Sequence, residues 1–358
     1  MYAIRFGVGL AQSSFFPGMQ YVIASWYRKD ELGKRSCICP AGYTIGTILS
    51  GLIMAAIFKG LNGVAGLRGW QWLFVINTCL ALPIAIAGFF VLPDVPEITQ
   101  AWYLSPAEVA LSRKRMELEG RANRGLYTRA KLASILTGWH LYLLSLLYIM
   151  YLNAAAFGAQ PAFALWLKGR GYGVTAINAY PALTAGLTLL VTVVCAWTSD
   201  SVFRGARWPP VVFSGFVNIV VSSCMAVWDI PDSWKWACFI LIGLTPGISG
   251  IFFAWAHEIC SADNEERALV TATMNKMAYV VQAWLPLLIW PQVEAPRYPK
   301  GYITMAVFGA GLMITALVTR WLDHWERAEK ARQTKGRVEP SRCAESAAAV
   351  RPKSSSSH

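Results

Sequence analysis

The chain has 358 residues, of which 55% are hydrophobic and only 15% are charged, and its mean hydropathy is +0.41. Soluble globular proteins carry about 25% charged residues, so this composition excludes a soluble fold, a disordered chain and a small disulfide-rich domain. The formal net charge is +12. In a membrane protein such an excess belongs on cytoplasmic loops, so we expect a lipid bilayer and no nucleic acid as partner.

The apolar residues fall into segments long enough to cross a membrane. A helix needs about 20 mostly apolar residues to cross the hydrocarbon core. Nine segments qualify, in chain order 2–26, 36–57, 71–92, 139–166, 174–197, 208–228, 236–256, 268–290 and 302–322. Tryptophans such as Trp26, Trp139 and Trp290 lie near the ends of these segments, where an aromatic belt belongs. The sequence therefore predicts an all-α, polytopic membrane protein.

The distribution of Lys and Arg predicts the orientation. Loops 27–35, 93–138, 198–207 and 257–267 hold 14 of these residues, whereas the intervening loops hold seven. By the positive-inside rule the first set of loops is cytoplasmic, and so is the basic segment after residue 322. The first predicted span then begins on the outer side.

The long loop 93–138 divides the predicted spans into three before it and six after it. Transporters built from two six-helix halves place one long loop between the halves. This pattern predicts that three of twelve helices are missing from the N-terminal side. The predicted parts are a remnant of an N-terminal half (1–92), a central cytoplasmic loop (93–138), a six-helix C-terminal half (139–322) and a cytoplasmic tail (323–358).

Two segments outside the spans carry local signals. Ser105 and Glu108 have the spacing of a capping box, with Pro106 between them, which predicts a helix over 106–120. The tail 323–358 is charged and ends in a run of serines before the last residue. We expect it to be disordered beyond an initial helical stretch.

Several other kinds of site lack support in the sequence. No GxxxxGK[ST] phosphate loop is present, so an ATP-driven pump is not expected. The eight Cys and four His form no set with zinc-ligand spacing, and the thiols are expected to be reduced and buried. We therefore expect no cofactor, no metal site and no enzymatic activity.

Polar side chains inside the predicted spans are the candidates for substrate contact, because they are costly in a membrane unless they face the bundle interior. The predicted substrate-binding residues are Arg5, Gln12, Tyr43, Asn153, Gln160, Asn275 and Gln282. Arg5 stands out, because a guanidinium inside a membrane requires an anion. Two alternatives stay open: the polar groups could bond neighbouring helices, and Arg5 could extend to the outer interface. Glu258 lies at the predicted cytoplasmic end of its span, where a gating or structural role is expected.

Several motifs resemble one known family. Residues 5–12 and 16–18 look like the fourth helix of the major facilitator superfamily, in its anion:cation symporter branch. Residues 69–74 and 92–97 resemble the entry to the sixth helix and the start of the central loop. Residues 199–207 look like the second copy of the superfamily's Asp–Arg loop motif. The resemblance implies nine of the twelve helices of that fold and a gating role for Asp200 and Arg204.

Further segments are similar to the fungal allantoate/pantothenate permease subfamily. They include Glu258-Ile259-Cys260, residues 263–268 and residues 295–298. The resemblance implies proton symport of a small organic anion or vitamin such as pantothenate, allantoate or nicotinate. It also implies a monomer in the plasma membrane. One departure matters, because Gln12 replaces a Glu of many relatives and cannot take up a proton.

Two other functions remain open from the sequence. The chain could be an inactive fragment, since the missing helices would leave its cavity unsealed. It could also be a membrane sensor that binds a ligand without transporting it, although the tail is too short to hold a folded signalling domain.

Overall fold

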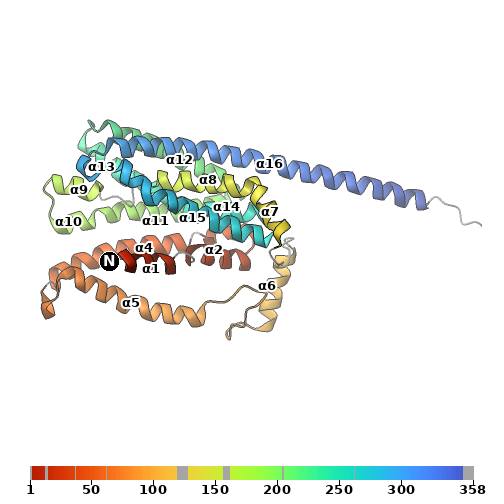
Figure 1. The fold of residues 1–358 in the computed structure, drawn as a ribbon, viewed down its shortest axis with the longest axis horizontal. Helices are drawn as coiled ribbons and strands as arrows, with labels where there is room; N and C mark the ends of the chain where they lie inside the picture. The colour runs from red at the N-terminus through yellow and green to blue at the C-terminus, as the bar shows by residue number, and fades with distance from the viewer. Residues whose placement is uncertain are drawn as a thin grey trace, which may run out of the picture. The chain divides into compact units, whose positions relative to one another are not determined.

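The computed structural model describes residues 2–12, 15–36, 38–61, 63–118, 128–155, 162–203, 205–261 and 263–349. Over these residues the protein consists of α-helices and short 3-10 turns, without strands, as Figure 1 shows. The all-α prediction is therefore confirmed. The chain separates into two units, Met1–Ala316 and Leu317–His358.

The region before the central loop begins with α1 (Tyr2–Gln12) and α2 (Phe15–Trp26). Together these cover the predicted span 2–26, whose residues 13 and 14 lie outside the described part of the chain. The long helices α4 (Ile38–Gly60) and α5 (Gly69–Val91) follow, with a 3-10 turn between them.

The first predicted cytoplasmic loop is itself helical. It forms α3 (Lys29–Ser36), a charged helix that packs against α11 and α14. Leu32 is fully buried and belongs to a small apolar cluster with Ala24 of α2 and Ala254 of α14. One leucine on an otherwise polar helix thus anchors this loop to the bundle.

The central loop contains α6 (Pro106–Leu118) and α7 (Arg129–Thr137). The predicted capping box is confirmed: the Ser105 amide donates to Glu108 Oε2 at 2.9 Å, and the Glu108 amide donates to Ser105 Oγ at 3.3 Å. These bonds satisfy amides that the first turn of a helix leaves free. The helix begins at Pro106 as predicted, and the expected end at residue 120 lies outside the described residues.

After the central loop, the apolar segments form helices that mostly break where Pro or Gly occurs. They are α8 (Trp139–Ala154), α9 (Ala162–Gly169), α10 (Val174–Ala179), α11 (Pro181–Ser201), α12 (Trp208–Val227), α13 (Asp232–Leu241), α14 (Ser249–Ile259) and α15 (Asn264–Ile289). Pro181 starts α11 directly after α10. Two 3-10 turns, η3 (Ile242–Leu244) and η4 (Pro246–Ile248), separate α13 from α14.

This break between α13 and α14 brings backbone close to α11. A Cβ added to Gly247 would lie 2.8 Å from Val191 Cγ1 and 2.9 Å from the Thr188 carbonyl oxygen. The Thr188 hydroxyl donates to the Gly243 carbonyl at 2.8 Å. Small residues that permit close approach, together with hydroxyl bonds between helices, are typical of packing inside a membrane.

Five helices in the described residues are long and apolar enough to cross a membrane, namely Gly69–Val91, Val174–Ser199, Trp208–Val227, Asp232–Ile259 and Pro299–Glu329. The bent pair α7 and α8 makes a sixth if it forms one span. The five helices coincide with predicted spans, whereas the bent pair begins at Arg129, in the predicted central loop, and overlaps the predicted span 139–166 over α8. The predicted spans 2–26, 36–57 and 268–290 correspond to α1 with α2, α4 and α15, and their crossing stays a prediction.

Helix α16 (Pro299–Ala349) differs from the expectation for the tail. We predicted disorder beyond an initial helical stretch of 323–358, whereas the helix continues to Ala349. The segment after residue 322 is rich in Ala, Glu, Lys and Arg, which have high helix propensity. Arg327 Nε also donates to Asp323 Oδ1 at 2.7 Å, an i,i+4 pair.

Candidate functional site

An aromatic core lies between α8 and α14. Tyr148 and Tyr151 of α8 pack against Phe252 and Phe253 of α14, with centroids 4.4 Å apart for Tyr151 and Phe252. The Tyr151 hydroxyl donates to the Pro246 carbonyl at 3.0 Å. This bond uses a carbonyl at the break between α13 and α14, so α8 holds the interrupted helix in place.

Buried asparagines line the helices next to this core. Asn153 of α8 is 2% exposed, and its Nδ2 donates to the Ile149 carbonyl at 2.8 Å. Asn275 of α15, which packs along α8, is 5% exposed. The Oδ1 atoms of both residues have no hydrogen-bond partner among the described residues. Because buried polar atoms are nearly always bonded, these two acceptors are suited to a ligand or water.

Asn218 of α12 is a third such residue, which the sequence analysis missed. Its Nδ2 donates to the Ala154 carbonyl at 3.0 Å and to Thr245 Oγ1 at 3.3 Å. Its Oδ1 also has no partner within the described part of the chain. The signal for it was present, because Asn218 is an amide in the middle of the apolar span 208–228.

The other predicted substrate residues are distributed differently. Gln12 and Tyr43 are exposed, Tyr43 by 81%, and Gln282 is half-buried. The side chain of Arg5 and the whole of Gln160 lie outside the described residues. The structure therefore places Asn153 and Asn275 on adjacent helices and leaves the predicted set as a whole untested.

A buried ion pair joins α12 to α14. Arg207, at the start of α12, donates from Nε and Nη2 to Glu258 Oε1 at 2.9 and 2.6 Å. Its Nη1 donates to Ser199 Oγ of α11 at 2.9 Å. The side chain of Arg207 is 1% exposed and that of Glu258 is 13% exposed. One guanidinium thus connects the ends of three helices.

This pair changes the view of the predicted gating residues. Glu258 is placed, but the side chain of Asp200 and the whole of Arg204 lie outside the described residues. The cation that meets Glu258 is Arg207, which we had noted only as the end of the Asp–Arg motif. An arginine directly before an apolar span was the available signal.

More charged groups gather where α15 begins. Lys131 Nζ of α7 lies 2.7 Å from Glu265 Oε2 and 3.1 Å from Asp263 Oδ2. Hydrogen bonds to Glu265 and then Asp263 raise the pKa of Lys131 above its ordinary value. His140 Nδ1 of α8 lies 2.6 Å from Glu266 Oε1. The N-terminus of α15 is therefore attached to both helices of the bent pair.

Arg267 links α15 to the region before the central loop. Its side chain is buried, and its Nη2 lies 3.5 Å from Ser25 Oγ. The guanidinium carbon lies 5.2 Å from the centre of the Tyr21 ring, a cation–π distance. Nε and Nη1 have no hydrogen-bond partner among the described residues.

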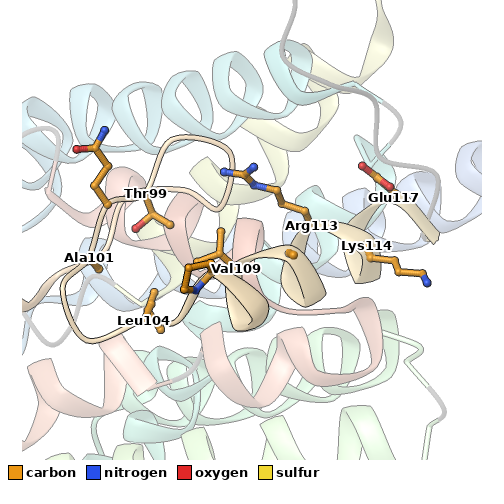
Figure 2. A pocket seen from close by; sticks show the side chains of 10 residues that line it. Thr99, Ala101, Leu104, Val109, Arg113, Lys114 and Glu117 are labelled. Carbon is orange, nitrogen blue, oxygen red and sulfur yellow. The ribbon is translucent and has the colours of Figure 1, made fainter.

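A cavity of about 670 Å³ lies in the central loop, as Figure 2 shows. Its lining residues are Thr99, Gln100, Ala101, Leu104, Pro106, Val109, Ala110, Arg113, Lys114 and Glu117. Arg113 donates to the carbonyls of Pro96 and Glu97 at 2.7 and 3.0 Å, so its charge organises the loop. The cavity lies outside the predicted spans and is not where a transported substrate would be held.

Curated relatives match most of the chain. The chain is 30% identical to "Pantothenate transporter liz1" of Schizosaccharomyces pombe over 89% of its own length and 62% of that protein. It is also 30% identical to "Pantothenate transporter FEN2" of Saccharomyces cerevisiae, over 92% of this chain and 65% of that protein. A third relative at 30% identity is the "Vitamin H transporter" of S. cerevisiae, over 86% and 53%. The chain thus spans less than two thirds of each of these relatives.

A solved structure and a family model agree with these relatives. The proton:xylose symporter XylE superposes with a TM-score of 0.62 over 83% of this chain and 65% of its own, at 14% identity, which shows a shared fold. The model of the Major Facilitator Superfamily matches residues 1–286. With its apolar helices, this is a multi-pass membrane protein, and the chain belongs to the Major Facilitator Superfamily.

Proposed function

We propose that this protein is a secondary transporter that carries a small organic anion across a membrane together with protons. The observation that carries the proposal is the 30% identity to two pantothenate transporters over about nine tenths of the chain. Family membership alone supports only the broader class, because many substrates are carried on one fold.

The substrate class follows from the names of the relatives and from the buried polar groups. Pantothenate and vitamin H both combine a carboxylate with amide or ureido groups. Arg5 would attract the carboxylate, while Asn153 and Asn275 would bond the polar body of the substrate through their unpartnered acceptors. Tyr43, Gln160 and Gln282 complete the proposed set with the amide of Gln12.

The proposed gate lies at the ends of α11, α12 and α14. There Arg207 meets Glu258 and Ser199. We assign Asp200 and Arg204 to the same gate, because they lie between Ser199 and Arg207 in the sequence, within the same Asp–Arg motif. Charge pairs of this kind favour one conformation until the helices move relative to one another. Gln12 cannot accept a proton, so the coupling proton is carried by another group.

Uptake of labelled pantothenate tests the proposal in cells that have no pantothenate uptake of their own. The protein expressed from its native gene should take up pantothenate faster than empty cells, and unlabelled biotin, nicotinate or allantoate should compete. Its proposed location predicts a signal at the plasma membrane, measured by surface labelling. Uptake equal to that of empty cells, at normal surface expression, would contradict the proposal.

Variants at the buried amides separate a substrate role from a packing role. Asn275→Asp keeps the size of the side chain but adds negative charge where an anion is proposed to bind. We expect it to raise KM strongly, and KM is measured on the folded fraction because an unpaired buried carboxylate also lowers stability. Gln282→Glu, at a half-buried position on the same helix, serves as a second test. An unchanged KM in both would remove α15 from the binding site.

A further inference from the structure

We propose that His140, Cys260 and Glu266 form a binding site for a divalent zinc-type ion. His140 lies in the first turn of α8, Cys260 directly follows α14, and Glu266 lies in the first turn of α15. The imidazole nitrogen, the thiol sulfur and the carboxylate oxygen all lie within 4.8 Å of one another. Helices α8 and α15 and the residue that follows α14 thus supply one ligand each to a single point.

The donor set fits zinc better than the alkaline-earth ions. Zinc binds Cys sulfur at about 2.3 Å, and His nitrogen or carboxylate oxygen at about 2.0–2.2 Å, usually with tetrahedral geometry. Calcium and magnesium prefer oxygen ligands only. Three protein ligands leave a fourth position for water, and binding would displace the thiol proton into solvent. Small side-chain movements suffice, since no atom has to travel far to reach a common centre.

The site is partly shielded from water. Cys260 is 2% exposed, and the side chains of His140 and Glu266 are 14% and 21% exposed. Cys260 is not in a disulfide. An ion can therefore reach the imidazole and carboxylate from solvent while the sulfur holds it from the interior.

The negative charge at the site comes from its own ligand Glu266. Around it, the charges of Asp263 and Glu265 are balanced by those of Lys131 and Arg267. Lys131 is already bound by Asp263 and Glu265. The guanidinium of Arg267 lies against Ser25 and the Tyr21 ring. A bound zinc ion would thus be neutralised by the Glu266 carboxylate and the Cys260 thiolate rather than by the groups around them.

The sequence analysis predicted no metal site, because no Cys and His stand at zinc-ligand spacing. The structure explains the difference, since about 120 residues separate His140 from Cys260 in the chain. The packing of α15 along α8, and of α14 against both helices, brings them together. An ion held here would connect the ends of three helices and hinder their relative movement.

Cobalt titration of the purified 358-residue chain in detergent tests the site. Cobalt is a spectroscopic substitute for zinc, and thiolate ligation gives it a charge-transfer band in the near ultraviolet. We expect one cobalt ion per chain, this band, and its loss when zinc is added. Zinc X-ray absorption of the unaltered chain should independently show one sulfur and several nitrogen or oxygen neighbours.

Matched variants identify the ligands. Cys260→Ser and His140→Ala should each weaken metal binding at least tenfold, and Cys260→Ser should abolish the thiolate band. Cys238→Ser, at a buried thiol in another cluster, and His324→Ala, at an exposed histidine, should leave both unchanged. Circular dichroism checks folding of each variant. Absence of the band and of a zinc–sulfur distance in the unaltered chain would overturn the proposal, as would an unchanged band in a folded Cys260→Ser variant.

Discussion

Helix α5 and the α13–α14 segment are both strongly apolar, yet they are packed in opposite ways. In the most apolar stretch of α5 none of the residues is buried, whereas 67% are buried in the corresponding stretch of Asp232–Ile259. Phe89 of α5 is 85% exposed, while Phe253 of α14 is fully buried. Hydropathy alone therefore does not tell which apolar helix faces lipid and which faces protein.

Small residues mark the buried helix. The α13–α14 segment carries Gly243, Gly247 and Gly250, and the first two lie against the backbone of α11. In α5 a Cβ added to Gly88 would contact only Cδ1 of Leu92, the residue directly after the helix, at 3.8 Å. Close packing between helices in a membrane depends on such small residues, since lipid offers no hydrophobic drive to association.

Truncating one phenylalanine in each helix should give the largest contrast. Phe253→Ala removes contacts with Tyr148 and Phe16, at centroid distances of 5.1 and 5.0 Å. We expect it to lower the free energy of unfolding in detergent by about 3–5 kcal/mol. Phe89→Ala should change it by less than about 0.5 kcal/mol. Similar losses for both variants would contradict the assignment of the two faces.

Removing a charge should show the same contrast on a smaller scale. Arg207→Ala leaves Glu258 without its buried partner and should cost about 3 kcal/mol of unfolding free energy. Arg115→Ala breaks the exposed pair with Glu31 and should cost about 0–1 kcal/mol. The double variant with Glu258→Ala should regain part of the first loss. No recovery in that double variant would mean that Arg207 acts through Ser199 or packing.

Adding one methyl group distinguishes close packing from open helix surface. Gly247→Ala forces a contact of 2.8 Å with Val191 and should destabilise the protein by about 1–3 kcal/mol. Gly46→Ala in α4 meets nothing within 4 Å and should stabilise its helix by about 0.5–1 kcal/mol. Thermal unfolding of both variants measures the difference. Destabilisation by Gly46→Ala would place an unrecognised neighbour on that face.

The smallest effect concerns α6, in the central loop. Hydrogen bonds from the backbone and side chain of Ser105 lower the pKa of Glu108. Such a group stabilises the folded state above its ordinary pKa, and the contribution is lost as the pH falls through the lowered value. Amide hydrogen exchange in the first turn of α6 should therefore accelerate, after correction for intrinsic rates, only at acidic pH. Ser105→Ala should weaken this dependence without abolishing it, because the backbone amide of residue 105 still donates to Glu108, and losing the hydroxyl cap should cost about 1 kcal/mol of local helix stability.

The sequence predicted the helices better than their contacts. Hydropathy and length identified the all-α fold, and the Ser105–Glu108 spacing located the start of α6. The breaks within spans follow from Pro181 and Pro246, but whether a Pro bends or ends a helix depends on the neighbours that bind its free carbonyls. The pairing of Arg207 with Glu258 could not be read from the chain, because the two residues are 51 positions apart.

The candidate substrate residues show the same limit. Helical spacing placed Asn153 and Asn275 inside spans, and both are buried. Spacing did not separate them from Tyr43, which is exposed, because it says which residues share a face and not what that face meets. Asn218 could have been found by the same spacing, because Ser214 and Ser222 lie four residues before and after it on one helix face.

The most direct test of the proposed function is uptake of labelled pantothenate into liposomes that contain the protein, with an imposed proton gradient. We predict that an inward proton gradient accelerates uptake and drives accumulation above the external concentration, and that a protonophore abolishes both. An uptake rate that does not change with the proton gradient would contradict proton symport. If none of pantothenate, biotin, nicotinate and allantoate is taken up, the account of this protein as an organic-anion transporter is contradicted.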